Sequence, residues 1–315
     1  MAVIQKMSNR IFSRLISNQL FPHLTWLRFI GFEFWMVGFT PFFIGYVIGA
    51  KTLFDFDLLY GFVIIACLTS ATFVLNHICD LDIDRKNPRK EFSLLVRGAL
   101  NVRQAWYLFW VFQITCLVMS LRYTSSEFVY CILGLTVISL VYNLEPFRLK
   151  TKPGLDIACN GLSLGFLIPL SAWSINQPLH NFPRLYFFAT LCYLMALYCP
   201  TMAVDTDFDR KSGVRTFATK FGAVPTMRIS WLFTIVGAST LIYCGIQEIF
   251  PWNYKLLVWT GWILPIEIII HYMYLPINSQ PSYDTVAKGS IILATVEAVA
   301  TLFFFIIFLD LISID

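Results

Sequence analysis

The chain has 315 residues, of which 57% are hydrophobic and 13% are charged, and its formal net charge is +4. Soluble domains carry about 25% charged residues, so this composition excludes a protein that faces water on all sides. Apolar runs recur along the chain, and many approach the roughly 20 residues that a bilayer-spanning helix needs. The composition therefore predicts an all-α membrane protein that crosses the bilayer several times.

The first 25 residues carry Lys6, Arg10 and Arg14 among apolar side chains. This pattern is typical of an amphipathic helix that lies on the membrane surface. Apolar runs bounded by charge or proline then predict nine spans within one domain, 1–315. Their approximate ranges are 27–50, 58–79, 104–121, 126–143, 156–175, 184–204, 228–249, 254–275 and 286–309.

The loops between the predicted spans alternate in basic content. Most of the 23 lysines and arginines fall on the side that the N-terminus shares, and the other side has only Lys51, Arg122, Arg184 and Lys255. Cytoplasmic loops carry the excess of basic residues in membrane proteins. The sequence therefore predicts a cytoplasmic N-terminus and, with nine spans, a C-terminus on the opposite side.

Acidic residues gather at the cytoplasmic ends of two predicted spans. Residues four apart share a helix face, so Asn76, Asp80 and Asp84 form one polar stripe and Asp205 and Asp209 form another. Carboxylates beside hydrocarbon are costly unless they are paired or bind metal. Mg²⁺ prefers a few carboxylates together with water and substrate phosphates, and the stripes therefore predict a magnesium site.

Two further aspartates, Asp82 and Asp207, lie two residues from the stripes. At that spacing each points sideways from its stripe, so we expect them to be solvated or hydrogen-bonded rather than to bind metal.

Basic residues in the loops on the same side of the membrane are candidates to bind a diphosphate: Arg148, Lys150, Lys152, Arg215 and Lys220. A diphosphate bound by metal ions is a good leaving group, because the cations neutralise the charge that builds on oxygen. With an isoprenoid tail, ionisation would give an allylic carbocation, which needs a dry cavity with aromatic walls. The 17% of aromatic residues are compatible with that chemistry.

Other kinds of site have little support. The eight cysteines form no CxxC pair and mostly lie within apolar runs, which is typical of small buried side chains. The four histidines are scattered, and the sequence contains no glycine-rich phosphate loop. No nucleic-acid partner is expected.

The spacing Asn76-x-x-x-Asp80-x-x-x-Asp84 resembles the first acidic motif of the UbiA superfamily of intramembrane prenyltransferases. Asp205-x-x-x-Asp209 resembles the second, and the runs 142–150 and 153–156 with Asn160-Gly161 also match the family. The resemblance implies a helical bundle around a central cavity that opens to lipid. It further implies a prenyl diphosphate donor, a hydrophobic acceptor and Mg²⁺, as two ions bridged by the diphosphate.

The resemblance also implies roles for individual residues. The metal ligands would be Asn76, Asp80, Asp84, Asp205 and Asp209, and the four aspartates would be the catalytic residues. Substrate would be bound by Asn76, Arg148 and Lys150, with Asn160 lining the cavity and Arg28 near the diphosphate.

Two departures leave the acceptor open. His77 follows Asn76, where the family usually has aspartate, and Thr201 stands where many members have tyrosine. Quinone precursors and other aromatic acids, chlorophyllide, haem, glycerol lipids and carotenoids all remain candidates. The runs 87–90 and 152–156 resemble the carotenoid-elongating branch.

Two alternatives to prenyl transfer stay open. A terpene cyclase would ionise the same donor and let its own double bonds quench the cation. A non-enzymatic cation transporter is disfavoured, because the acids cluster at one membrane face whereas transporter sites usually lie near the midplane.

Overall fold

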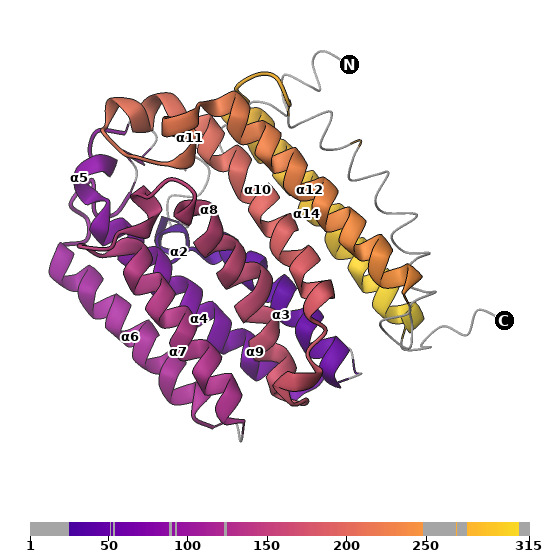
Figure 1. The fold of residues 1–315 in the computed structure, drawn as a ribbon. Helices are drawn as coiled ribbons and strands as arrows, with labels where there is room; N and C mark the ends of the chain where they lie inside the picture. Colours follow the sequence, from indigo (N-terminus) through magenta and orange to yellow (C-terminus); the bar gives the residue numbers. More distant parts are fainter. Residues whose placement is uncertain are drawn as a thin grey trace, which may run out of the picture. The chain divides into compact units, whose positions relative to one another are not determined.

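The computed structural model describes residues 25–50, 52, 54–87, 90–91, 93–122, 125–247, 269 and 276–308. Every regular element within them is helical, which confirms the predicted fold class (Figure 1). The chain divides into two compact units, Met1–Gly38 with Val63–Met119 and Phe39–Phe62 with Ser120–Asp315. Two boundaries fall inside helices α3 (Trp35–Ala50) and α4 (Phe56–Cys79), and the third falls before the last residue of α6 (Val102–Ser120).

The first unit contains α2 (Thr25–Phe29), η2 (Phe32–Phe34), α5 (Leu81–Asp84), α6 (Val102–Ser120) and parts of α3 and α4. The backbone is not regularly helical between α2 and η2, because Gly31 has a left-handed φ of 68°. A Cβ at Gly31 would lie 2.6 Å from the Phe73 ring, on which Phe34 stacks at 4.5 Å between centroids. The predicted span 27–50 is therefore interrupted near its start.

The exposed side chains of helix α6 indicate whether water or lipid surrounds the chain. Tyr107, Val111, Ile114 and Val118 are each more than half exposed, and their spacing places them on one face. Soluble proteins rarely expose a contiguous apolar stripe of this kind, whereas hydrocarbon favours it. The helix begins at a reciprocal cap, in which Asn101 Oδ1 accepts from Gln104 N–H and Gln104 Oε1 accepts from Asn101 N–H.

The second unit contains most of the remaining helices: α7 (Ser126–Asn143), η4 (Leu149–Thr151), α8 (Leu155–Asn160), η5 (Gly161–Leu167), α9 (Ile168–Ser174), η6 (Leu179–Asn181), α10 (Arg184–Lys211), α11 (Phe217–Phe221), α12 (Ala223–Ile246) and α14 (Tyr283–Phe308). Helix α10 packs along α12 and also contacts α14 and η5 (Figure 1).

The predicted span 156–175 is helical throughout but not uniformly α-helical, since η5 is a π-helical segment between α8 and α9. The backbones of η5 and α10 approach closely at Gly165, where a Cβ would lie 2.4 Å from Leu191 Cα. A small residue at this position is what allows the two segments to pack.

Five of the described helical segments are long and apolar enough to cross a membrane, and the 16-residue α3 is a shorter apolar helix. Together with the family fold established below, they make the chain a multi-pass membrane protein. Eight predicted spans coincide with helical segments to within a few residues at most ends. The ninth, 254–275, lies outside the described residues apart from residue 269, and the predicted surface helix before residue 25 also lies outside them. The count of nine stays a prediction.

Candidate active site

The first acidic motif lies where α4 passes into α5. Asp80 N–H donates to Asn76 O at 2.9 Å, and Asp84 N–H donates to Asp80 O at 2.8 Å. Hydrogen bonds between residues four apart therefore continue through Asp80, which lies between the end of α4 and the start of α5. The three residues thus share a face, as predicted. Asp84 is buried, with 7% of its surface exposed. Asp82 lies off this face, with its side chain 92% exposed and paired with Arg85 at 3.2 Å, which confirms the prediction of a solvated role.

His77 lies within this motif. The Phe29 ring of α2 stacks on the imidazole with centroids 5.0 Å apart and planes 13° apart. His77 Nδ1 lies 3.7 Å from Asp84 Oδ2 and has no hydrogen-bond partner among the residues that the structure describes. The stack brings α2, and with it the half-buried Arg28, beside the first motif.

The second acidic motif lies inside α10, which continues to Lys211 rather than ending near 204. Asp205 and Asp209 are one helical turn apart and half-buried, whereas Asp207 is exposed, as predicted. Beyond the helix, Gly213 has a φ of 76° and Val214 N–H donates to Asp209 O at 2.9 Å. This turn directs the chain from the motif toward α11.

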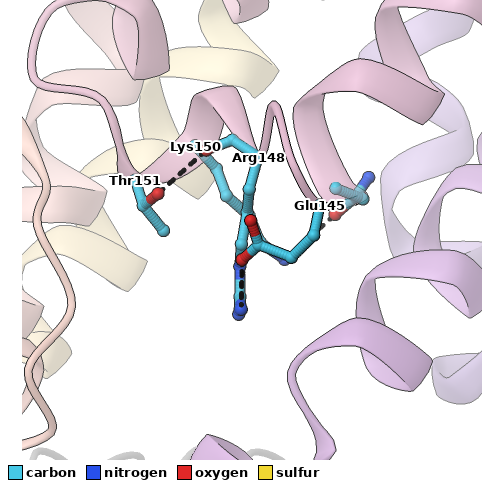
Figure 2. A network of polar contacts seen from close by, with 5 residues as sticks. Glu145, Arg148, Lys150 and Thr151 are labelled. Atoms are coloured by element: carbon cyan, nitrogen blue, oxygen red, sulfur yellow. Dashed lines mark hydrogen bonds and ion pairs between the residues drawn. The ribbon is translucent and has the colours of Figure 1, made fainter.

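The basic loop follows α7. Arg148 adopts a left-handed φ of 38°, and its Nη1 lies 3.4 Å from Glu145 Oε1. Thr151 Oγ1 donates to the Arg148 carbonyl at 2.9 Å, which stabilises the turn (Figure 2). Lys150 Nζ donates to Asn143 Oδ1 at 3.0 Å, and Asn143 is only 1% exposed. Arg148 and Lys150, which are predicted to bind the diphosphate, thus contact neighbouring side chains, while Lys152 is exposed.

Asp156 joins this loop to the segment after the second motif. One of its oxygens, Oδ1, accepts from Gly154 N–H at 2.7 Å and from Ile157 N–H at 3.0 Å. The other, Oδ2, accepts from Phe217 N–H at 2.6 Å. Asp156 is fully buried. The sequence predicts an acid in the first turn of a helix here, but it does not reveal the bond to a residue 61 positions away.

A half-buried polar cluster lies between α7, α8 and α10. Tyr142 Oη and Tyr198 Oη are 2.8 Å apart, and Asn160 Nδ2 donates to Tyr142 Oη at 3.1 Å and to Asp156 O at 2.8 Å. Tyr198 precedes Asp205 by seven residues, so both lie on one face of α10. Tyr198 has no role among the residues predicted from the sequence, although this spacing is a usable signal. The predicted cavity position Asn160 belongs to the cluster.

The last two basic residues predicted to bind the diphosphate are Arg215 and Lys220. Both are exposed, and they lie on either side of the cap at the start of α11. Arg215 precedes α11, and Lys220 lies within it with Nζ 5.0 Å from the centre of the Phe221 ring. Thr216 Oγ1 accepts from Thr219 N–H and Thr219 Oγ1 accepts from Thr216 N–H, which fixes the start of the helix. Their contact with a diphosphate stays a prediction.

The donor atoms of the acidic motifs fit a hard divalent cation. Within the described part of the chain, no three His, Cys, Asp or Glu side chains gather closely enough to hold a metal by themselves. Mg²⁺ uses such incomplete sets, because it keeps water molecules and completes its coordination with substrate phosphates. Oxygen donors on one helix face, including the buried Asp84, suit this mode of binding.

Solved structures share the fold of this chain. A UbiA homolog from Archaeoglobus fulgidus bound to DMAPP and Mg²⁺ superposes with a TM-score of 0.71 at 22% identity, covering 88% of this chain and 98% of the homolog. The apo structure of a UbiA homolog from Aeropyrum pernix K1 superposes with a TM-score of 0.70 at 19% identity, covering 86% and 97%.

Curated relatives match shorter segments. A chloroplastic 2-acylphloroglucinol 4-prenyltransferase of Humulus lupulus is 32% identical over 167 residues, which is 47% of this chain and 38% of the relative. A 4-hydroxybenzoate octaprenyltransferase of Francisella tularensis subsp. novicida is 25% identical over 183 residues, or 55% and 59%. The matched segments thus cover between 38% and 59% of the length of these curated relatives.

The chain also matches a family as a whole. The sequence model of the UbiA prenyltransferase family matches residues 38–280, a range that contains both acidic motifs and the basic loop between them. The chain belongs to the UbiA prenyltransferase family.

Proposed function

We propose that the protein is a magnesium-dependent intramembrane prenyltransferase that moves a prenyl group from a prenyl diphosphate to a lipophilic acceptor. The observation that supports this most strongly is the family match, because it includes both acidic motifs. In each motif the aspartates keep a common helix face beside an apolar segment. The DMAPP and Mg²⁺ bound by the Archaeoglobus homolog support the class of donor and of metal.

The acidic side chains would hold two Mg²⁺ ions together with the donor diphosphate: Asn76, Asp80 and Asp84 in the first motif, and Asp205 and Asp209 in the second. Bound Mg²⁺ would supply neutralisation of the charge that develops on the leaving diphosphate. Arg148 and Lys150 would complete the phosphate cradle, with further contributions from Lys152, Arg28, Arg215 and Lys220.

The acceptor that we propose is an electron-rich aromatic ring. The Humulus and Francisella relatives are named for acylphloroglucinol and hydroxybenzoate, and a rice relative of 27% identity is a probable homogentisate phytyltransferase. In such a transfer the carbon–oxygen bond of the donor breaks and diphosphate leaves. A bond forms between C1 of the prenyl group and a ring carbon, which then loses its proton.

We further propose that the N-terminus and both acidic motifs face the cytoplasm. The distribution of lysine and arginine along the sequence supports this orientation. It would let a water-soluble diphosphate head reach the motifs while the prenyl tail lies in the membrane.

Product analysis tests the proposal. Purified protein in lipid nanodiscs is incubated with Mg²⁺ and dimethylallyl, geranyl or longer diphosphates, with and without phenolic acceptors. We expect diphosphate release that depends on the acceptor, and a product heavier than the acceptor by one prenyl group. A cyclic hydrocarbon or alcohol formed without acceptor would instead establish the cyclase. Intact donor under every condition, with carotenoid acceptors included, would contradict both.

A further inference from the structure

His77 presents a buried nitrogen atom that no described protein group satisfies. Its Nδ1 is shielded from solvent and lacks a hydrogen-bond partner among the described residues. Buried polar atoms in native proteins are nearly always paired with protein, water or an ion. An unsatisfied nitrogen beside an acidic motif therefore points to a bound group.

The neighbouring carboxylate lies close to this nitrogen but does not form a hydrogen bond with it. Asp84 Oδ2 lies 3.7 Å from His77 Nδ1, which is too long for a hydrogen bond. Two donor atoms that bind one cation at about 2.1 Å each are separated by about 3 Å. A decrease of about 0.7 Å in their separation would thus allow both atoms to bind one ion, and both side chains are about nine-tenths buried, at 11% and 10% exposure.

The imidazole is also held in place. The Phe29 ring stacks almost parallel to it, with planes 13° apart. Asp84 is held by its own backbone bond to Asp80 O, so it stays in register with the motif. Fixed ring orientation is the usual property of metal-binding histidines.

We propose that His77 Nδ1 and Asp84 Oδ2 bind the same divalent cation, so that the first acidic motif contains a nitrogen ligand. The inference rests on the proposed metal-dependent function. It also assigns a role to His77, which departs from the aspartate that the family resemblance implies. Imidazole favours Co²⁺, Zn²⁺ and other transition ions over Mg²⁺. This motif therefore binds transition ions more tightly, relative to Mg²⁺, than an all-oxygen site does.

The direct test uses a spectroscopic signal. Full-length protein in detergent is loaded with Mn²⁺ and inorganic diphosphate, and nitrogen coupling to the metal is measured by electron spin echo envelope modulation. We expect ¹⁴N modulation from a coordinated imidazole in the wild type and its loss in His77→Asp. The matched control is His180→Asp, since His180 lies in η6 of the other unit. It keeps the modulation.

A second variant guards against a folding defect. In His77→Gln we expect the ratio of Co²⁺ to Mg²⁺ affinity, measured by calorimetry, to fall about 10-fold. No ¹⁴N modulation in the wild type, modulation that persists in His77→Asp, or an unchanged ratio in His77→Gln would overturn the inference. Prenyl transfer without ¹⁴N modulation would refute this inference alone, whereas modulation without any donor turnover would refute only the proposed function.

Discussion

Asp156 links two loops by accepting hydrogen bonds from backbone N–H groups. It is fully buried and accepts from Gly154, Ile157 and Phe217. These bonds connect the end of the basic loop to the start of α11, which follows the second acidic motif. A carboxylate suits this role, because both of its oxygens accept hydrogen bonds.

Asp156→Asn should therefore destabilise the protein. The amide NH₂ that replaces one oxygen cannot accept from a backbone N–H, and the lost hydrogen bond to a charged group is worth about 1.5–3 kcal/mol. Thermal unfolding in detergent measures the change. Asp284→Asn is the matched control, because Asp284 is exposed and pairs with Lys288 on the surface of α14. Exposed pairs of this kind contribute about 0.5 kcal/mol or less. Equal losses in the two variants would contradict the role of Asp156.

The sequence predicts residue positions well where one helix fixes them. Asn76, Asp80 and Asp84 share a face because spacing within a helix determines direction. The Asp156 bond to Phe217 and the Tyr142 bond to Tyr198 could not be predicted in this way. Each joins residues more than 50 positions apart, so it depends on how helices pack rather than on local spacing.

At the scale of elements, the packing of η5 on α10 depends on glycine. At Gly165 a Cβ would lie 2.4 Å from Leu191 Cα and 2.8 Å from Leu191 N, both of which are backbone atoms that cannot rotate away. Gly134 in α7 differs, because among the described residues no atom beyond its own chain neighbours and helix backbone lies within 4 Å of its Cβ position. The two helical glycines thus make a matched pair.

Gly165→Ala should separate η5 from α10 and destabilise the protein by about 1–3 kcal/mol, as overpacking does. Gly134→Ala should leave stability unchanged or raise it slightly, since alanine favours helix by up to about 1 kcal/mol. Thermal unfolding in detergent compares both variants with the wild type. The packing described for Gly165 would be incorrect if Gly165→Ala unfolded no earlier than Gly134→Ala.

The spans were predicted closely because apolar length is a strong local signal. Their internal irregularities were not predicted. Gly31 interrupts the first span, and a π-helical segment interrupts 156–175, through backbone geometry that hydropathy does not report. Polar residues extend α10 to Lys211, past the predicted end at 204, since a helix can continue beyond the apolar layer.

At the scale of the whole molecule, the basic loops predict how the chain sits in the membrane. We expect an N-terminal tag to be digested by protease in sealed inside-out vesicles and a C-terminal tag to be protected, because nine spans place the ends on opposite sides. Immunoblotting of both tags on the full chain measures this. Digestion of both tags or of neither would contradict the span count, and digestion of the C-terminal tag alone would contradict the orientation.

We propose that the two acidic motifs act on a single prenyl diphosphate with Mg²⁺. The most direct measurement is the rate of Mg²⁺-dependent diphosphate release by four variants of equal charge change. Asp80→Asn and Asp209→Asn each remove a proposed ligand and should reduce the rate about 100-fold or more. Asp82→Asn and Asp207→Asn alter exposed neighbours and should leave it unchanged. Similar rates in all four variants would contradict the account.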